Sequence, residues 1–184
     1  MEALSQRLVK PQWLENFAAT GSGRLRMISN SMGPLLKAGD TITVSRVAPE
    51  RIRMGDLIVF QHHTGLVTHR AILVTRRAGT HRIYERSDRY GRVSRIQADQ
   101  VLGIVKEISR GQRSTRLDCL PLGLLQRIYS LCVIAEHAVH RVCRHVPGGR
   151  HVLQKYAALP CKVIRALCTR GIYRLVHGTA YPLT

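Results

Sequence analysis

The sequence predicts a mainly β domain followed by an amphipathic α-helical extension. From about residue 24 to about residue 110, short apolar runs alternate with turn residues, which is typical of antiparallel strands. Beyond Gly111 the apolar residues instead recur at steps of three and four, the period of an amphipathic helix. We therefore expect three parts: a short helical segment over 1–23, the β domain over 24–110 and a basic helical tail over 111–184.

The N-terminal segment is expected to form one or two short helical turns. Trp13, Leu14 and Phe17 fall on one face of a helix, and Pro11 suits a helix start. The sequence Gly21-Ser22-Gly23 then ends the segment before the first strand.

Six runs in the β domain are expected to form strands. Residues 41–44 alternate between polar and apolar side chains, as a half-buried strand does, whereas 57–60 is continuously apolar, as a buried strand is. Gly55-Asp56 and Ala78-Gly79 are turn signals between them. The expected strands are 25–28, 41–44, 57–60, 66–73, 81–85 and 101–108.

The tail contains two amphipathic stripes. The first runs over 125–146 and is expected to end at Pro147-Gly148-Gly149, and the second follows Pro160 over 164–175. Arginines and histidines occupy the opposite faces. Two arrangements fit this pattern: a helical hairpin packed on the β domain or on itself, and a basic amphipathic pair lying in a bilayer interface.

The charge of the chain constrains its partners. The 184 residues include 29 Lys and Arg against 11 Asp and Glu, for a net charge of +18. Such a surface attracts polyanions, either nucleic acid or anionic lipid headgroups. Aromatic residues are only 5% of the chain, which counts against a platform that stacks single-stranded bases. We therefore expect an anionic membrane surface, and not nucleic acid, to meet the basic tail.

No segment of the sequence has the roughly 20 uninterrupted apolar residues of a spanning helix. The N-terminus carries charges throughout and lacks the apolar core of a signal peptide. These features predict a protein that stays in the cytoplasm or associates peripherally with a membrane.

The cysteines give no sign of a metal or redox site. Their number is odd, and no pair has C-x-x-C spacing. We expect reduced thiols, no metal and no cofactor. The five are Cys119, Cys132, Cys143, Cys161 and Cys168.

The stretch SNSMGPLLKAGD at 29–40 places Ser31 just after an apolar run and before a stiff turn. A serine here is either part of a turn or a nucleophile, and a nucleophile needs a base and an orienting group further along the chain. Four further blocks follow in order. They are RMGDLIVF at 53–60, VTHRA at 67–71, RSD at 86–88 and VLG at 101–103.

Together these blocks resemble the signal peptidase I superfamily, which shares its catalytic fold with the self-cleaving SOS-type repressors. The resemblance covers about residues 25–108 and implies an antiparallel β catalytic fold and serine endopeptidase activity. It also implies a peptide or protein substrate with small residues at the −1 and −3 positions of the cleavage site. The superfamily divides into branches by the type of residue at the position of the general base. Here His69 is followed by Arg70, which resembles the histidine branch of endoplasmic-reticulum, archaeal and sporulation-associated enzymes.

The resemblance implies that Ser31 is the nucleophile, His69 the general base and Asp88 the group that orients His69. A neutral imidazole can take a serine proton near pH 7, and a carboxylate usually holds its tautomer. Side chains alternate in direction along the strand expected at 67–71, so the His69 side chain can point toward Ser31. Other interpretations remain: His69 as a solvated side chain, Asp88 as a turn-capping residue, and Asp99 as a more distant orienting group.

The neighbouring residues match the family only in part. Ser29 matches a serine whose hydroxyl can help the nucleophile's backbone N–H bind an oxyanion. Asn30 and Ser87 replace usual glycines, although asparagine tolerates a positive φ. Val93 and Ser94 stand where the histidine branch often has a further acidic residue.

Two other classes of function compete with a processing protease. A self-cleaving repressor would cut an Ala-Gly bond upstream of the serine, but Ala38-Gly39 and Ala78-Gly79 both follow Ser31. A non-catalytic module would use the basic surface to bind anionic lipid or nucleic acid. Because no membrane anchor is evident, we expect a specialised processor of a dedicated peptide or protein.

Overall fold

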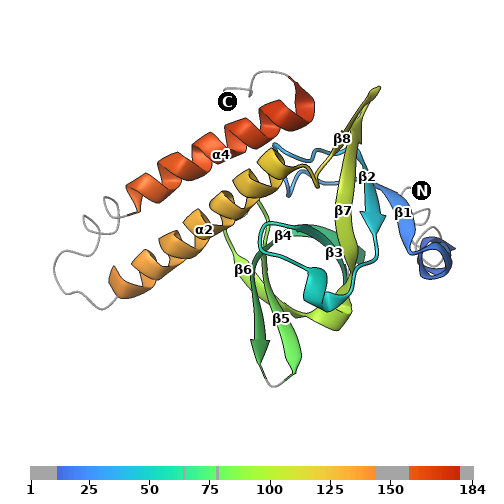
Figure 1. Cartoon of the computed structure of the whole chain (residues 1–184), viewed down its shortest axis with the longest axis horizontal. Helices are drawn as coiled ribbons and strands as arrows, with labels where there is room; N and C mark the ends of the chain where they lie inside the picture. Colours follow the sequence, from blue (N-terminus) through green and yellow to red (C-terminus); the bar gives the residue numbers. More distant parts are fainter. Residues whose placement is uncertain (1–11, 64, 78, 144–157, 179–184) are drawn as a thin grey trace.

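The computed structural model describes residues 12–63, 65–77, 79–143 and 158–178. They form a curled antiparallel sheet with two long helices side by side on one flank (Figure 1). The expected mainly β domain with a C-terminal helical extension is confirmed.

Within the described residues the sheet has eight strands in the order β1-β2-β7-β3-β4-β5-β6, and β8 pairs with β7. Every pairing is antiparallel. Two short 3₁₀ helices, η1 (Pro49–Arg51) and η2 (Ala98–Gln100), precede β3 and β7. The strands are β1 (Ser22–Arg26), β2 (Thr41–Ser45), β3 (Leu57–His62), β4 (Gly65–Arg77), β5 (Thr80–Arg86), β6 (Val93–Gln97), β7 (Val101–Arg110) and β8 (Arg113–Arg116).

Two of these strands, β6 and β8, were not predicted from the sequence. β6 is the last strand in the sheet order and its apolar residues are interrupted by Arg95, so it has little apolar signal. β8 contains no apolar residue and forms because Gly111, at φ +58°, closes a tight turn that pairs Arg110 with Arg113. The sheet therefore continues into the region that was assigned to the tail.

Alternation of side chains divides the core into two main clusters. One is shared by the sheet and the helices, where Leu122 and Ile172 pack with Met32 and Leu36 of the loop between β1 and β2. The other lies on a different part of the curled sheet and consists only of residues from the sheet and its connections. Its buried members are Ile52, Ile58, Phe60, Ala71, Ile83, Ile96, Ala98 and Ile104.

The N-terminal helical segment forms over 12–20, the described part of the predicted helix. The ring of Trp13 stacks on Phe17 with centroids 4.7 Å apart, and its Nε1 donates to the Arg24 carbonyl at 2.9 Å. Gly21 ends the helix at φ +69° and its N–H donates to the Phe17 carbonyl. Residues 1–11 of the predicted segment, Pro11 among them, lie outside the described residues.

Helices α2 (Leu120–Cys143) and α4 (Leu159–His177) form the two arms of the predicted hairpin (Figure 1). They pack on each other and on the sheet, which is the first of the two arrangements expected for the tail. The predicted stop at 147–149 lies outside the described residues. None of the described helices combines the length and apolarity needed to cross a bilayer, and the five cysteines are free.

Candidate functional site

Ser31 lies on the loop between β1 and β2, and its neighbours fix that loop to the core. Met32 and Leu36 are fully buried in the cluster under the helices. At the end of the loop the buried carboxylate of Asp40 accepts two hydrogen bonds from Arg110, at 2.7 and 2.6 Å. The loop is thus anchored on both sides of Ser31, whose side chain remains partly exposed.

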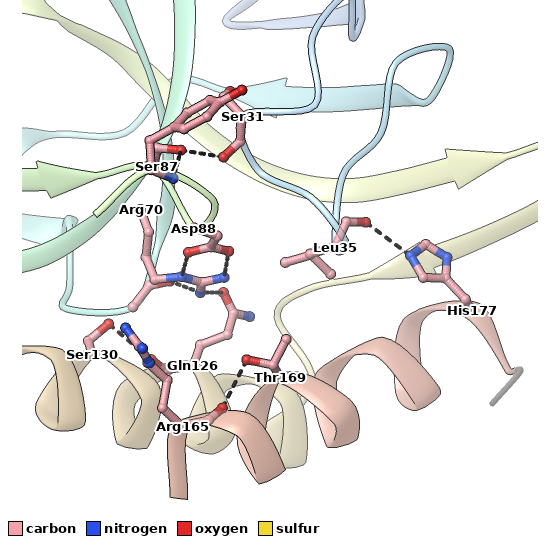
Figure 2. Close-up of polar contacts among 12 residues, drawn as sticks. Ser31, Leu35, Arg70, Ser87, Asp88, Gln126, Ser130, Arg165, Thr169 and His177 are labelled. Carbon is pink, nitrogen blue, oxygen red and sulfur yellow. Dashed lines mark hydrogen bonds and ion pairs between the residues drawn. The ribbon is translucent and has the colours of Figure 1, made fainter. Parts of the chain in front are cut away.

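The turn that follows β5 holds the main chain of Ser31. The Ser87 hydroxyl donates to the Ser31 carbonyl (Figure 2), and the Arg89 N–H donates to the same oxygen at 3.1 Å. Ser87 also accepts from the Tyr90 N–H at 3.1 Å and so stabilises the turn itself. The hydroxyls of Ser29 and Ser31 lie 3.2 Å apart. Two hydroxyl groups and a fixed backbone therefore meet at one point of the surface.

His69 lies on β4, and its ring meets a carboxylate of the neighbouring strand. Its Nδ1 is 2.6 Å from Oε2 of Glu85 on β5, and the two side chains are 20% and 7% exposed. The edge of the Phe60 ring faces the imidazole, with centroids 5.9 Å apart. When Nδ1–H donates to a carboxylate, the neutral imidazole keeps Nε2 as a free proton acceptor. This pair has the arrangement of a general base with its orienting group.

Asp88 does not occupy the place expected of it. Its carboxylate accepts from Arg70 Nε at 2.9 Å and from Arg70 Nη2 at 2.7 Å (Figure 2). Among the described residues it makes no hydrogen bond to His69. The physical reason is strand alternation: His69 and Arg70 are consecutive, so their side chains leave opposite faces of β4. Asp88 follows Arg70 to the side of the helices, and Glu85 takes the position beside His69.

The Arg70–Asp88 pair is part of a buried polar cluster. Arg70 is 1% exposed, and its Nη1 donates to the Gly55 carbonyl and to Gln126 Oε1, both at 3.1 Å. Its guanidinium also lies over the Tyr129 ring, 4.8 Å from the centroid. Burial alone would lower the pKa of Arg70, but the charge and hydrogen bonds of Asp88 outweigh it and raise that pKa. Burial also raises the pKa of Tyr129 to about 12.

The other carboxylate that the sequence offered as the orienting group, Asp99, does not lie beside His69. Asp99 is exposed in η2 and makes no hydrogen bond to His69 within the described residues. Glu85 was missed, although it closes a run that had been predicted as a strand. Alternation along the strand places Glu85 on the same face as Ile83, and the sequence alone indicates this much. That Glu85 lies beside His69 follows only from the strand register, which pairs Glu85 with Ala71.

The described residues contain no group of three His, Cys, Asp or Glu side chains placed to hold a metal ion. The candidate site consists of the hydroxyls of Ser29 and Ser31, the His69–Glu85 pair, and the turn after β5 that contacts both. No hydrogen bond connects Ser31 Oγ to His69 among the described residues. Both are nevertheless attached to one short segment, 85–89, which holds the imidazole by a side chain and the serine by its main chain.

Comparison of the sequence with known protein families finds no match, and comparison with curated protein sequences finds none either.

Proposed function

We propose that the protein is a serine endopeptidase of the signal-peptidase type, in which Ser31 is the nucleophile, His69 the general base and Glu85 the group that orients His69. The observation that carries this proposal is segment 85–89. Glu85 binds His69 Nδ1 at its beginning, and Ser87 and Arg89 bind the Ser31 carbonyl at its end. The candidate nucleophile and the candidate base therefore belong to one hydrogen-bonded unit.

The reaction assigns one step to each group. His69 Nε2 accepts the Ser31 hydroxyl proton while Oγ bonds to the scissile carbonyl carbon, and it then donates that proton to the leaving amine. In the second half His69 takes a proton from water as the water oxygen bonds to the acyl carbon, and it returns that proton to Ser31 Oγ as the acyl–oxygen bond breaks. Ser31 and His69, both in the described part of the chain, are not hydrogen-bonded to each other, and the proposed mechanism does not require it, because catalytic hydrogen bonds often form only when a substrate binds.

Ser29 is the proposed oxyanion residue, together with the Ser31 backbone N–H. Its hydroxyl lies 3.2 Å from Ser31 Oγ, and Ser29 is exposed, so a substrate can reach it. Ile28, which precedes Ser29 in the chain, is 71% exposed and offers an apolar surface to a substrate. The substrate class follows from the family resemblance alone: a dedicated peptide or protein with small residues before the cleaved bond.

The test compares protein N-termini in the source cells expressing wild type or Ser31→Ala. We expect a set of N-termini that follow small residues and that appear only with the wild type. His69→Gln should abolish the same set. Ser114→Ala on β8 is the matched control, because it removes a hydroxyl outside the site and should leave the set unchanged. Circular dichroism shows whether each variant is folded.

Identical sets of N-termini in wild type and folded Ser31→Ala would refute a processing protease. The self-cleaving alternative predicts instead that the purified chain fragments at raised pH, which its intact mass would reveal. Either result would separate the proposal from its competitors.

The hairpin supports a second proposal, contact with an anionic membrane surface. Leu120, Leu124 and Leu131 lie on one face of α2 and are 90%, 60% and 53% exposed, and Leu167 of α4 is 58% exposed. Exposed basic residues of the same helices accompany them, such as Arg127 of α2 and Lys162 of α4, and this combination is typical of helices that lie in a bilayer interface. Vesicles containing phosphatidylglycerol should bind the wild type in a salt-dependent way, and Leu124→Gln/Leu131→Gln should weaken binding. Equal binding to phosphatidylcholine vesicles would contradict this proposal.

A further inference from the structure

We propose that the cavity between the Ser31 loop and α4 is a binding site for a phosphate group. The cavity measures about 440 Å³. Gly33 and Pro34 line it from the loop, Arg86 and Arg89 from the end of β5 and the following turn, and Lys162 and Arg170 from α4. Figure 2 shows the setting, with the Arg70–Asp88 pair between the sheet and the two helices. The proposal does not depend on the serine chemistry.

Arg86 is the residue that indicates a ligand. It is only 9% exposed, and its Nε is buried without a hydrogen-bond partner. Arg86 pairs directly with Arg70 across β4 and β5, so both guanidinium groups leave the same face of the sheet. Asp88, the carboxylate of this region, is fully engaged by Arg70. A buried guanidinium nitrogen without a hydrogen-bond partner is costly, and a bound anion would remove that cost.

The surroundings of Arg86 add positive charge, and the one carboxylate among the residues that line the cavity, Asp88, is paired with Arg70. Within the described part of the chain, Arg89, Lys162 and Arg170 form no ion pair. Arg165 also lines the cavity but pairs with Glu136 at 3.2 Å. Glu136 has a buried oxygen without a partner, yet this carboxylate does not line the cavity. The cavity therefore has a strong excess of cations.

The chemistry of these cations favours a phosphate group. Planar guanidinium groups donate pairs of hydrogen bonds that match phosphate oxygens, and a terminal phosphate can neutralise more than one cation. The volume leaves room for the group to which the phosphate is attached. A phosphate monoester or a pyrophosphate fits these requirements, and it could belong to a soluble molecule or to a lipid headgroup.

The experiment titrates the full chain with inorganic pyrophosphate in a calorimeter at fixed ionic strength. We expect saturable binding by the wild type and by the control Arg95→Gln, which removes an exposed arginine of β6 outside the cavity. Binding should be about tenfold weaker or more in Arg86→Gln and in Arg170→Gln, since each loses charged hydrogen bonds. Arg170 is exposed, so its variant keeps the fold and tests the site even if Arg86→Gln does not fold.

The proposal fails if no saturable binding occurs, or if all four proteins bind pyrophosphate equally, since that would be unspecific attraction to a basic surface. A second arm uses vesicles with phosphatidic acid or phosphatidylglycerol at matched surface charge. Preference for phosphatidic acid that Arg86→Gln abolishes would identify a lipid headgroup as the source. Pyrophosphate binding without that preference would identify a soluble phosphorylated ligand.

Discussion

His69 and Arg70 are consecutive residues of β4, and each meets a carboxylate of its own. Glu85 binds His69 on one face of the sheet, and Asp88 binds Arg70 on the other. The two pairs differ in surroundings, because the His69 side chain is 20% exposed while Arg70 is 1% exposed. We infer that the first pair serves chemistry at the surface and the second holds the sheet to the helices.

Replacing Glu85 tests the orienting role. Glu85→Gln keeps the size of the side chain but removes the charge that holds His69 Nδ1–H, so we expect the rate of hydrolysis to fall about a hundredfold or more. The imidazolium formed during the reaction also loses its stabilising charge. The measurement is the rate of cleavage of a substrate found by N-terminal mapping. A rate equal to that of wild type would exclude Glu85 from catalysis.

Replacing Asp88 should instead reduce stability. Asp88→Asn leaves the buried Arg70 charge uncompensated, and breaking a buried pair in this way typically costs about 3–5 kcal/mol. The free energy of unfolding in urea measures this cost. Asp118→Asn is the matched control, since it breaks the exposed pair with Arg116, which solvent screens, and should cost much less. Equal losses in the two variants would contradict a structural role for Asp88.

At the scale of elements, α2 packs directly on the turn that precedes β3. Gly55 adopts φ +98° in this turn, and a Cβ there would lie 3.0–3.1 Å from backbone atoms of Gln126 and Arg127. Its carbonyl also accepts a hydrogen bond from Arg70. The absence of a side chain thus allows the helix backbone to approach the sheet closely.

Gly55→Ala should destabilise the protein by about 2 kcal/mol or more, from the positive φ together with the contact against α2. Gly79→Ala is the control, because Gly79 has φ +78° but nothing within 4 Å of an added Cβ. Thermal unfolding of both variants separates the two contributions. A loss in Gly55→Ala no greater than in Gly79→Ala would show that the contact with α2 has no cost.

At the scale of the whole molecule, α4 contacts the Ser31 loop through its residue His177. The His177 ring donates from Nε2 to the Leu35 carbonyl at 3.0 Å, and the Arg113 side chain donates to the His177 carbonyl at 2.7 Å. His177 is 7% exposed. Helix α4 therefore restrains the loop that carries the candidate nucleophile, Ser31.

This contact predicts a pH dependence of stability. Burial lowers the pKa of His177 below its ordinary 6.5, against a smaller opposing effect of the hydrogen bond to Leu35. The unfolded chain then binds a proton that the folded chain resists, so stability is complete above pH 6.5 and is lost as the pH falls toward the lowered pKa. Urea unfolding between pH 8 and pH 5, about the range in which histidine titrates, measures the slope.

His177→Gln should reduce that slope, because the amide can still donate to Leu35 but does not titrate. Part of the slope should remain, since burial also lowers the pKa of His137. The exposed His63 provides the control, and His63→Gln should leave the slope of wild type. An unchanged slope in His177→Gln would refute the assignment.

The sequence by itself determined the division into β and helical parts, the loop of Ser31 and the excess of positive charge. Each of these follows from local periodicity, turn residues or composition. Only the tertiary structure decided which carboxylate meets His69, because that depends on the pairing of β4 with β5 and on a shift of register between Ala71 and Leu73. The same holds for β6 and β8, whose residues form strands because neighbouring strands offer hydrogen bonds and not because their own pattern requires it.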